Sequence, residues 1–452
     1  MAVRFVIVGG GPAGNTAATH AARLGAEVTM IEQDVVGGAA HLWDCIPSKA
    51  MIATGGALAA VRRTPEMGLT TAQVEVDPVA LKARIEAIEQ KLEHGVRHLL
   101  DSQGVRIIRG RGRLTSAHTV VAETTDGSEE IEADVILLAT GSRPRLPDWA
   151  TVDGNRVLST RDAYPPPVWP EHLVVIGSGV TGVEFVHMFS SLGSQVTLIV
   201  SRQHVLPQKD SEVAAALEDE LLRRGVRLLK GARAVGIDTS DDGVVVRCDD
   251  GRQSEGSHAL LAIGSVPNSE DLGLEAAGVE SDGGYVPVDE LCRTNVAHIY
   301  AAGDLSGKLP LSSVAAMQGR RIAEHAMGVQ ARSSRTIDYD KAASAIFTVP
   351  EIADVGLAEA DAFAEGQKVR VTKVPFSASP KALIESHSRG FVKLVSDPAT
   401  GVVLGGSIVG RHAGELISVI AVAVTNGLRV ADIVDSLLVH PSLAEALAEA
   451  AD

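Results

Sequence analysis

Residues 4–14 read RFVIVGGGPAG and determine the expected fold of the first part of the chain. The apolar, β-branched run Arg4–Gly9 predicts a strand, and the Ala-rich stretch Asn15–Leu24 predicts a helix. Glu27–Glu32 predicts a second strand, so the chain opens with a βαβ unit. Between strand and helix the glycines follow the spacing GxGxxG, and we call this stretch, Gly9–Gly14, the first glycine turn. A βαβ unit with such a turn is typical of dinucleotide binding.

Each glycine of the first glycine turn has its own task in this kind of binding. Gly9 permits the tight turn, Gly11 lets a pyrophosphate approach the backbone, and Gly14 lets the helix pack on the strand. The N-terminus of the helix attracts the negative charge of the phosphates. Glu32 ends the second strand, where a carboxylate accepts a hydrogen bond from a ribose hydroxyl. We therefore expect a dinucleotide at this turn.

The same unit occurs a second time. His172–Ile176, Val183–Leu192 and Gln195–Val200 again predict strand, helix and strand. A second GxGxxG, Gly177–Gly182, joins the first two of them, and we call it the second glycine turn. Two such units in one chain predict an α/β protein with two Rossmann-like dinucleotide-binding domains.

The second unit differs from the first at the end of its second strand. Ser201 and Arg202 follow this strand, and no acidic residue takes the place of Glu32. The missing carboxylate removes repulsion toward a 2′-phosphate, and Arg202 is a cation that pairs with one. The sequence therefore favours NADPH, with NADH as the alternative. The other interpretation of Arg202 is an ordinary solvent-exposed loop residue.

The composition limits the remaining possibilities. At roughly 100–200 residues per domain, 452 residues predict two to four domains. A net charge of −16 makes nucleic acid and anionic membranes improbable partners. No apolar run approaches the roughly 20 residues of a membrane span. Met1–Gly11 lacks the basic start of a signal peptide, and three cysteines make no disulfide framework. We therefore expect a cytoplasmic protein and no metal site.

The pattern of predicted strands and helices changes after about residue 335, where a separate α+β domain is expected. Pro144–Pro170 is rich in proline and predicts a boundary. Further strands are expected at 105–109, 133–139, 299–304, 345–348, 370–375, 390–395 and 402–409, and helices within 78–100 and at 211–224, 413–426 and 430–438.

Several short motifs carry a resemblance to a known family. Residues 37–49 read GGAAHLWDCIPSK. The other motifs are ATGSRP at 139–144, AIGSVPN at 262–268, YAAGD at 300–304, FTVPE at 347–351 and HPSLAE at 440–445. Together they resemble the flavoprotein disulfide reductases, the family of dihydrolipoamide dehydrogenase, glutathione reductase and mercuric reductase. The resemblance covers nearly the whole chain, although Ser265 stands where the family usually has Arg.

The resemblance implies FAD, a nicotinamide dinucleotide and a homodimer. It implies an FAD-binding domain at 1–150 and 270–335, an NAD(P)H-binding domain at 151–269 and a dimerisation domain at 336–452. The expected FAD-binding residues are Gly9, Gly11, Pro12, Ala13, Gly14, Glu32, Gly38, Lys49, Thr140, Gly141, Gly303 and Asp304. The expected NAD(P)H-binding residues are Gly177, Gly179, Val180, Thr181, Gly182, Glu184, Ser201, Arg202 and Gly264.

The chain departs from the family at its redox-active segment. The family has two cysteines separated by four residues, but here the first position is Ala40 and only Cys45 remains. Cys248 and Cys292 lie in expected structural segments, so no internal pair replaces the missing one. Without the pair, dithiol–disulfide exchange fails. Electrons are then expected to leave the flavin directly, as in the actinobacterial NAD(P)H:quinone reductases that this segment resembles closely.

Two charged pairs are implied by the resemblance. Lys49 is expected to form a salt bridge to Glu184 near the flavin, where a positive charge favours the reduced, anionic ring. His440 and Glu445 match the family's general-base pair, which reaches the flavin site of the partner subunit. Without a thiol to deprotonate, His440 either donates a proton to a quinone oxygen or is inherited without a catalytic task.

Other questions stay open at this point. Cys45 is either a thiolate that tunes the flavin or forms a sulfenic acid, or a small packing residue. Trp43 either stacks on an aromatic acceptor or packs, and His41 is expected at the solvent or at a helix start. The main hypothesis is a quinone reductase. The alternatives are a thiol, disulfide or peroxide reductase that uses Cys45 alone, a nucleotide transhydrogenase, and a redox-sensing flavoprotein.

Overall fold

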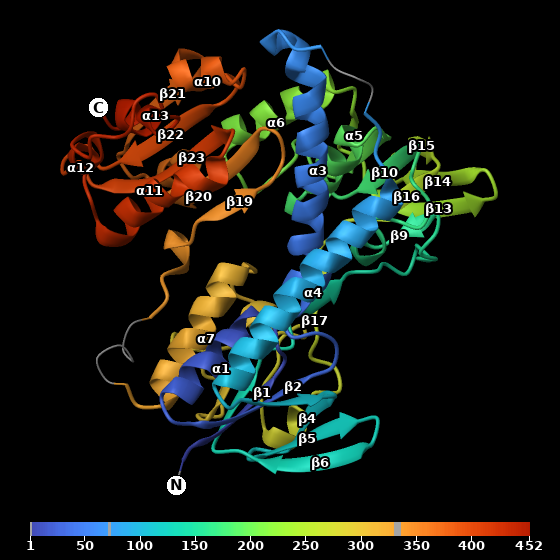
Figure 1. Cartoon of the computed structure of the whole chain (residues 1–452), viewed down its shortest axis with the longest axis vertical. Coiled ribbons are helices and arrows are strands. Elements are labelled where there is room, and N and C mark those ends of the chain that lie inside the picture. Colours follow the sequence, from blue (N-terminus) through green and yellow to red (C-terminus); the bar gives the residue numbers. More distant parts are fainter. Residues whose placement is uncertain (1, 71–73, 330–335) are drawn as a thin grey trace. The chain divides into compact units, whose positions relative to one another are not determined.

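The computed structural model describes residues 2–70, 74–329 and 336–452 (Figure 1). Its internal contacts divide the chain into two compact units, each made of three segments. The first unit comprises Met1–Ser48, Val79–Arg145 and Ser265–Tyr339, and the second comprises Lys49–Pro78, Leu146–Gly264 and Asp340–Asp452. The expected boundary at 335/336 falls partly on residues outside the described ranges.

The first unit is built on a five-stranded parallel sheet in the order β18-β7-β1-β2-β3. The glycine turn follows β1 at the carboxyl edge of this sheet, where doubly wound folds bind nucleotides. The elements of the unit are β1 Arg4–Val8, α1 Pro12–Arg23, β2 Glu27–Glu32, α2 Ala39–Leu42, α4 Pro78–Ser102, β3 Arg106–Arg109, β4 Arg111–Ser116, β5 Thr119–Thr124, β6 Gly127–Glu132, β7 Val135–Leu138, β8 Ser142–Pro144, β17 Ser265–Pro267, β18 Ile299–Ala301 and α7 Ser312–Ala326.

Both faces of this sheet are covered, which explains why β1 is apolar at successive positions. Phe5 and Ile7 pack into one core with the alanines of α1 and with Ile322 of α7. Val6 and Val8 point to the opposite face, into a core that includes residues of the antiparallel sheet β4-β5-β6. A parallel strand buried on both sides reads as a continuous hydrophobic run, as β1 does.

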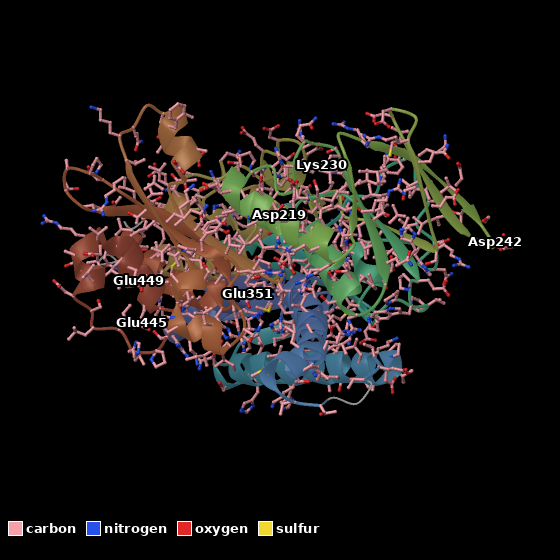
Figure 2. All side chains as sticks on the ribbon, turned by 90° about the horizontal axis from the view of Figure 1, so that it is seen from above. Asp219, Lys230, Asp242, Glu351, Glu445 and Glu449 are labelled. Atoms are coloured by element: carbon pink, nitrogen blue, oxygen red, sulfur yellow. The ribbon has the colours of Figure 1, made fainter. Side chains whose placement is uncertain are left out.

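The second unit contains a parallel sheet of the same style, in the order β12-β11-β10-β16-β9. An antiparallel sheet, β13-β14-β15, contributes to its core, and Asp242 marks the turn between β13 and β14 (Figure 2). These elements are α3 Ile46–Arg63, which begins in the first unit, and β9 Val157–Leu158, β10 His172–Ile176, α5 Val180–Ser191, β11 Gln195–Val200, α6 Ser211–Arg223, β12 Arg227–Lys230, β13 Ala234–Ser240, β14 Gly243–Cys248, β15 Gln253–Gly256 and β16 His258–Leu261.

The second unit also holds the expected α+β region, an antiparallel sheet in the order β19-β20-β23-β22-β21. Helices α11 and α13 pack on this sheet through a shared apolar core, and Glu445 and Glu449 of α13 are labelled in Figure 2. The elements are β19 Ser344–Ile346, β20 Glu351–Gly356, α9 Glu359–Ala364, β21 Arg370–Pro375, α10 Pro380–Ile384, β22 Phe391–Ser396, β23 Val403–Gly410, α11 Ala413–Asn426, α12 Val430–Val434 and α13 Glu445–Ala451.

A few elements differ from the sequence expectations. The helix expected at 430–438 ends at Val434, and Leu437 has a positive φ of 50° that no helix accommodates. The first helix begins at Pro12, three residues earlier than expected, because proline is well suited to the first helical position. Helices α2, α3, α7, α9, α10 and α13 are additional to those expected. No helix in the described ranges is long and apolar enough to cross a membrane.

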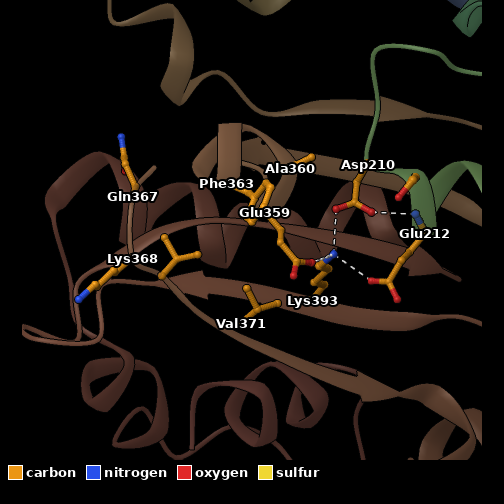
Figure 3. Close-up of a pocket in the computed structure, with 11 residues that line it drawn as sticks. Asp210, Glu212, Glu359, Ala360, Phe363, Gln367, Lys368, Val371 and Lys393 are labelled. Atoms are coloured by element: carbon orange, nitrogen blue, oxygen red, sulfur yellow. Dashed lines mark hydrogen bonds and ion pairs between the residues drawn. The ribbon is translucent and has the colours of Figure 1, made fainter. Parts of the chain in front are cut away.

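A pocket of about 790 Å³ opens in the second unit beside a buried lysine (Figure 3). Lys393 of β22 is 3% exposed and forms ion pairs with Asp210 and Glu212, both at 2.9 Å, and with Glu359 of α9. Asp210 is the N-cap of α6, and its side chain is 6% exposed. These ion pairs raise the pKa of Lys393 even though burial acts in the opposite direction. The cluster fixes the start of α6 to the antiparallel sheet.

Lys393→Ala is expected to lower stability by about 3 kcal/mol, because it leaves the buried carboxylate of Asp210 without a counter-charge. Lys373→Ala is the matched control, since Lys373 pairs with the same Glu212 at 2.7 Å but is 41% exposed. An exposed pair contributes about 0–1 kcal/mol. Differential scanning calorimetry compares the two. Equal shifts in melting temperature would contradict this account of the cluster.

Candidate functional site

The backbone of the first glycine turn comes as close to its neighbours as glycine permits. Gly9 has a φ of +107°, and a Cβ there would lie 2.3 Å from the carbonyl oxygen of Ala139. A Cβ on Gly14 would lie 2.0 Å from the carbonyl oxygen of Gly9. By contrast, a Cβ on Gly11 would meet nothing within 4 Å. Gly9 and Gly14 are thus required for packing, and Gly11 leaves open space at the N-terminus of α1, where a pyrophosphate fits.

Glu32 lies beside the first glycine turn, at the end of β2. Its Oε2 accepts a hydrogen bond from the backbone N–H of Gly10 at 2.6 Å, and its Oε1 accepts one from Asp34 at 2.8 Å. Burial raises the pKa of Glu32, while these backbone hydrogen bonds act in the opposite direction. Gly38 approaches from the other side, since a Cβ on it would lie 2.9 Å from the Cα of Gly11. The expected ribose-binding acid and the expected phosphate-binding backbone therefore meet in one place.

Two further motifs of the first unit, at 139–144 and 300–304, are held by side-chain hydrogen bonds. Thr140 donates through Oγ1 to the carbonyl oxygen of Asn268 at 2.7 Å, and Asn268 donates back through Nδ2 at 2.9 Å. Asp304 accepts a hydrogen bond from Ser142 at 2.6 Å. The N–H of Gly303 donates to the fully buried side chain of Gln318 at 2.7 Å. Gly141 has a φ of +68° between Thr140 and Ser142.

Sequence reasoning missed Ser142, Asn268 and Gln318 as positioning groups. Their polar side chains carry no motif of their own. Ser142 and Asn268 lie within the motifs at 139–144 and 262–268, but the motifs assign no contact to either side chain.

The second glycine turn has the same geometry as the first. Gly177 has a φ of +111°, and a Cβ there would lie 2.2 Å from the carbonyl oxygen of Ala262. A Cβ on Gly182 would lie 1.8 Å from the carbonyl oxygen of Gly177, whereas a Cβ on Gly179 would meet nothing within 4 Å. Val180 and Thr181 begin α5 and are exposed. This repetition indicates that both turns accept the same kind of phosphate group.

The residues expected to select the nucleotide lie next to the second glycine turn. Ser201 and Arg202 follow β11 and are exposed, and the carbonyl oxygen of Arg202 accepts from the N–H of Gly231 at 3.0 Å. Gly264 has a φ of +98° and ample space around it. The guanidinium of Arg202 is accessible to a ligand.

Lys49 and Glu184 form the expected ion pair. The Nζ of Lys49, on α3, lies 2.9 Å from the Oε2 of Glu184, on α5. The side chain of Glu184 is 8% exposed, and its Oε1 accepts from the backbone N–H of Phe347 at 2.9 Å. The ring centroid of Phe347 lies 4.8 Å from Nζ, a cation–π contact. Three segments far apart in the sequence thus fix one lysine ammonium.

Segment 37–49 has a single thiol. Cys45 precedes α3 and is partly exposed, and its Sγ lies 3.8 Å from the Oγ of Ser312 at the start of α7. All three cysteines of the chain are free, and Cys248 and Cys292 are buried. Burial raises the pKa of Cys292 to about 11, so this thiol stays protonated. His41 is partly buried in α2 rather than solvent-facing, and Gly37 provides the space for its ring.

His440 and Glu445 also form the expected pair. The Nδ1 of His440 lies 2.7 Å from the Oε1 of Glu445, the first residue of α13. The N–H of Ser442 and the imidazole of His440 hold the pKa of Glu445 below its usual value. The side chain of His440 is 71% exposed, so its Nε2 is accessible. The carboxylate favours the tautomer with a proton on Nδ1, which makes Nε2 a base.

The two glycine turns fit two dinucleotides, because each leaves an open phosphate position at a helix N-terminus. The described residues contain no group of His, Cys, Asp and Glu side chains that would hold a metal ion. Fold and site together define a class of flavoprotein oxidoreductases that use a nicotinamide dinucleotide.

The chain belongs to the pyridine nucleotide-disulphide oxidoreductase family. The family matches residues 3–319, and its dimerisation domain matches residues 342–451. This confirms the expected fold class and the cofactors of the family, FAD and NAD(P)H.

Several known proteins are similar over the full length of the chain. An NAD(P)H dehydrogenase (quinone) of Mycobacterium tuberculosis is 43% identical over 100% of this chain and 94% of its own length. A dihydrolipoyl dehydrogenase of Zymomonas mobilis is 34% identical over 98% and 96%. Among solved structures, LpdA of M. tuberculosis superposes with a TM-score of 0.95 at 43% identity, covering 99% of both chains. The HOCl-induced flavoprotein disulfide reductase RclA of Escherichia coli has a TM-score of 0.88 at 25% identity, covering 99% of both.

Proposed function

We propose that this chain is an FAD-dependent NAD(P)H:quinone oxidoreductase that works without a redox-active disulfide. The observation that carries the proposal is the segment 37–49, which retains Cys45 and Lys49 but has Ala40 at the first of the family's two cysteine positions. The three free cysteines support it, since Cys248 and Cys292 are buried. The M. tuberculosis relative that is named an NAD(P)H dehydrogenase (quinone) supports the same acceptor class.

The proposed binding residues have separate tasks. When bound, FAD supplies the two-electron chemistry between the nicotinamide and the acceptor. The first glycine turn would hold its pyrophosphate, and Glu32 would accept from a ribose hydroxyl. Thr140, Gly141, Gly303 and Asp304 would hold the remainder of the FAD. The second glycine turn would hold the nicotinamide dinucleotide, with Arg202 as the cation for a 2′-phosphate, which favours NADPH.

Lys49 and His440 supply the charge and the proton that the reaction needs. Lys49, fixed by Glu184, places a positive charge where negative charge develops on a reduced flavin. A quinone takes up two electrons and two protons, so reduction by a hydride equivalent requires one proton from elsewhere. We assign that proton to His440: its Nε2 takes up a proton from solvent, Glu445 stabilises the resulting imidazolium, and Nε2 passes the proton to the quinone oxygen.

A homodimer is part of the proposal. The matched dimerisation domain supports it, and so do exposed apolar side chains around His440, with Leu437 at 90% and Val439 at 75% exposure. In this assembly His440 would serve the partner's flavin. We propose three domains: an FAD-binding domain formed by 1–150 together with 270–335, an NAD(P)H-binding domain at 151–269 and a dimerisation domain at 336–452. A cytoplasmic location, based on the few cysteines, completes the proposal.

Stopped-flow spectroscopy tests the function. NADPH is expected to bleach the flavin of the holoenzyme. Menadione is then expected to reoxidise the flavin faster than a manually mixed assay can resolve. Lipoamide and glutathione disulfide should give negligible turnover, because no second thiol completes the exchange. Fast turnover of either disulfide would refute the quinone assignment. Reoxidation by NAD would favour a transhydrogenase, and reoxidation by peroxide would favour a peroxide reductase.

Cys45→Ser tests whether the thiol takes part in quinone reduction. The variant is expected to keep the rate of menadione reduction within about twofold of the wild type, because serine preserves the volume of the side chain. Cys248→Ser is the control for a cysteine outside the site. A tenfold loss with Cys45→Ser alone would move the thiol into the mechanism and favour the single-cysteine alternative.

A further inference from the structure

A buried histidine lies one helical turn beyond Glu184. His187 is on α5 at position i+3 from Glu184, so both side chains share a face of the helix. It is 1% exposed, and its Nδ1 receives a hydrogen bond from the Nη1 of Arg224 at 2.9 Å. Among the described residues its Nε2 has no hydrogen-bond partner. Burial, reinforced by Arg224, lowers the pKa of His187 to about 3, so the imidazole is neutral.

Arg224 also binds the segment that fixes Glu184. It caps the C-terminal end of α6, and its Nη2 donates to the carbonyl oxygen of Val349 at 2.6 Å. Its Nε donates to Glu220 at 2.9 Å. Val349 lies two residues after Phe347, whose N–H donates to Glu184. A single guanidinium therefore connects α5, through His187, to the segment 347–349.

Neutral His187 suits this connection because a guanidinium only donates hydrogen bonds. Nδ1 must accept from Arg224, so the ring proton is on Nε2. The hydroxyl of Ser191 lies 3.2 Å from the same Nδ1 and adds a second contact. A protonated histidine would repel Arg224, and the low pKa prevents this across the physiological pH range.

We propose that Arg224 and His187 are positioning residues for the Lys49–Glu184 pair. They hold the segment 347–349 against α5, so that the Phe347 N–H stays on Oε1 of Glu184 and leaves Oε2 for Lys49. The inference rests on the proposed role of Lys49 beside the flavin. Neither residue belongs to a glycine turn or to a motif of the family resemblance.

Arg224→Met tests the proposal with two measurements. Hydrogen–deuterium exchange of the Phe347 amide should become about tenfold faster, because the hydrogen bond to Glu184 opens more often. Flavin reduction by saturating NADPH should become about tenfold slower, with little change in NADPH affinity, because Arg224 contacts Glu220, His187 and Val349 and leaves the backbone of the second glycine turn in place. Arg223→Met is the matched control, since Arg223 also pairs with Glu220, at 3.0 Å, and is 49% exposed. It should change neither measurement.

His187 provides an independent pair of variants in case Arg224→Met does not fold. His187→Asn keeps an acceptor near the position of Nδ1 and should behave like the wild type. His187→Leu removes the acceptor and should speed up exchange at Phe347. Folded Arg224→Met or His187→Leu protein with wild-type exchange at Phe347 would overturn the proposal. If exchange accelerates but NADPH does not reduce even the wild-type flavin, the proposed function fails and the positioning role for catalysis fails with it.

Discussion

Gly182→Ala is expected to weaken NADPH binding about a hundredfold while FAD stays bound. The added Cβ would lie 1.8 Å from the carbonyl oxygen of Gly177, so α5 has to move away from β10. Such overpacking costs about 3 kcal/mol, and if the whole cost falls on NADPH binding, affinity falls about a hundredfold. FAD should remain, because the first glycine turn lies in the other unit. Flavin absorbance gives the FAD content, and the dependence of the flavin reduction rate on NADPH concentration gives the apparent NADPH affinity.

Gly179→Ala makes this test specific for the ligand. Gly179 has a φ of −74°, and its Cβ would meet no protein atom within 4 Å, so the fold should tolerate the methyl group. The methyl group would instead occupy the proposed pyrophosphate position. For Gly179→Ala we expect an unchanged melting temperature and weaker NADPH binding. Gly11→Ala, at the equivalent position of the first glycine turn, should weaken FAD binding. Wild-type affinity for NADPH in Gly179→Ala would show that the second glycine turn is not the nucleotide site.

Lys49→Met is expected to slow flavin reduction by about a hundredfold, the effect of removing one preorganised electrostatic group from a reaction site. Two causes act together. The positive charge beside the proposed flavin position is lost, and the buried Glu184 carboxylate keeps only the Phe347 N–H as a partner. Single-turnover stopped-flow measurements with NADPH give the rate constant directly.

Lys209→Met is the control for losing a half-buried lysine. Lys209 is 21% exposed, against 29% for Lys49, and its ion pair with Asp354 has a similar length, 2.7 Å. It should reduce stability without changing the rate of flavin reduction. If both variants slow reduction equally, the effect of Lys49→Met reflects general destabilisation and not the site.

The two βαβ units were predictable because their physics is local. A β-branched run and a GxGxxG turn, followed in the first unit by an alanine-rich helix, specify strand, turn and helix without reference to the rest of the chain. Helix α3 was not predictable in the same way, because Pro47, Gly55 and Gly56 interrupt its pattern. Pro47 is harmless in the first turn of a helix. Gly55 permits close approach, since a Cβ there would lie 3.0 Å from the side chain of Ser191.

The candidate site was predictable only where its groups are side chains in recognisable motifs. Lys49 and Glu184 could be paired from the family resemblance, as could His440 and Glu445. Glu184 also accepts a hydrogen bond from the backbone N–H of Phe347. Every residue except proline has such a group, so no motif marks it. The roles of Arg224 and His187 depend on the packing of α6 against other segments, which a single sequence does not display.

The two oxygens of Glu184 have a consequence for how this chain can be divided. One binds Lys49 and the other binds Phe347, and neither partner belongs to the stretch 151–269 that carries the second glycine turn. If that stretch were excised or grafted onto another protein, it would keep the second glycine turn. It would lose the Lys49 ammonium and the Phe347 N–H, which both orient Glu184. A protein that received only this stretch would gain the proposed nucleotide-binding turn without the ion pair and backbone hydrogen bond that hold Glu184.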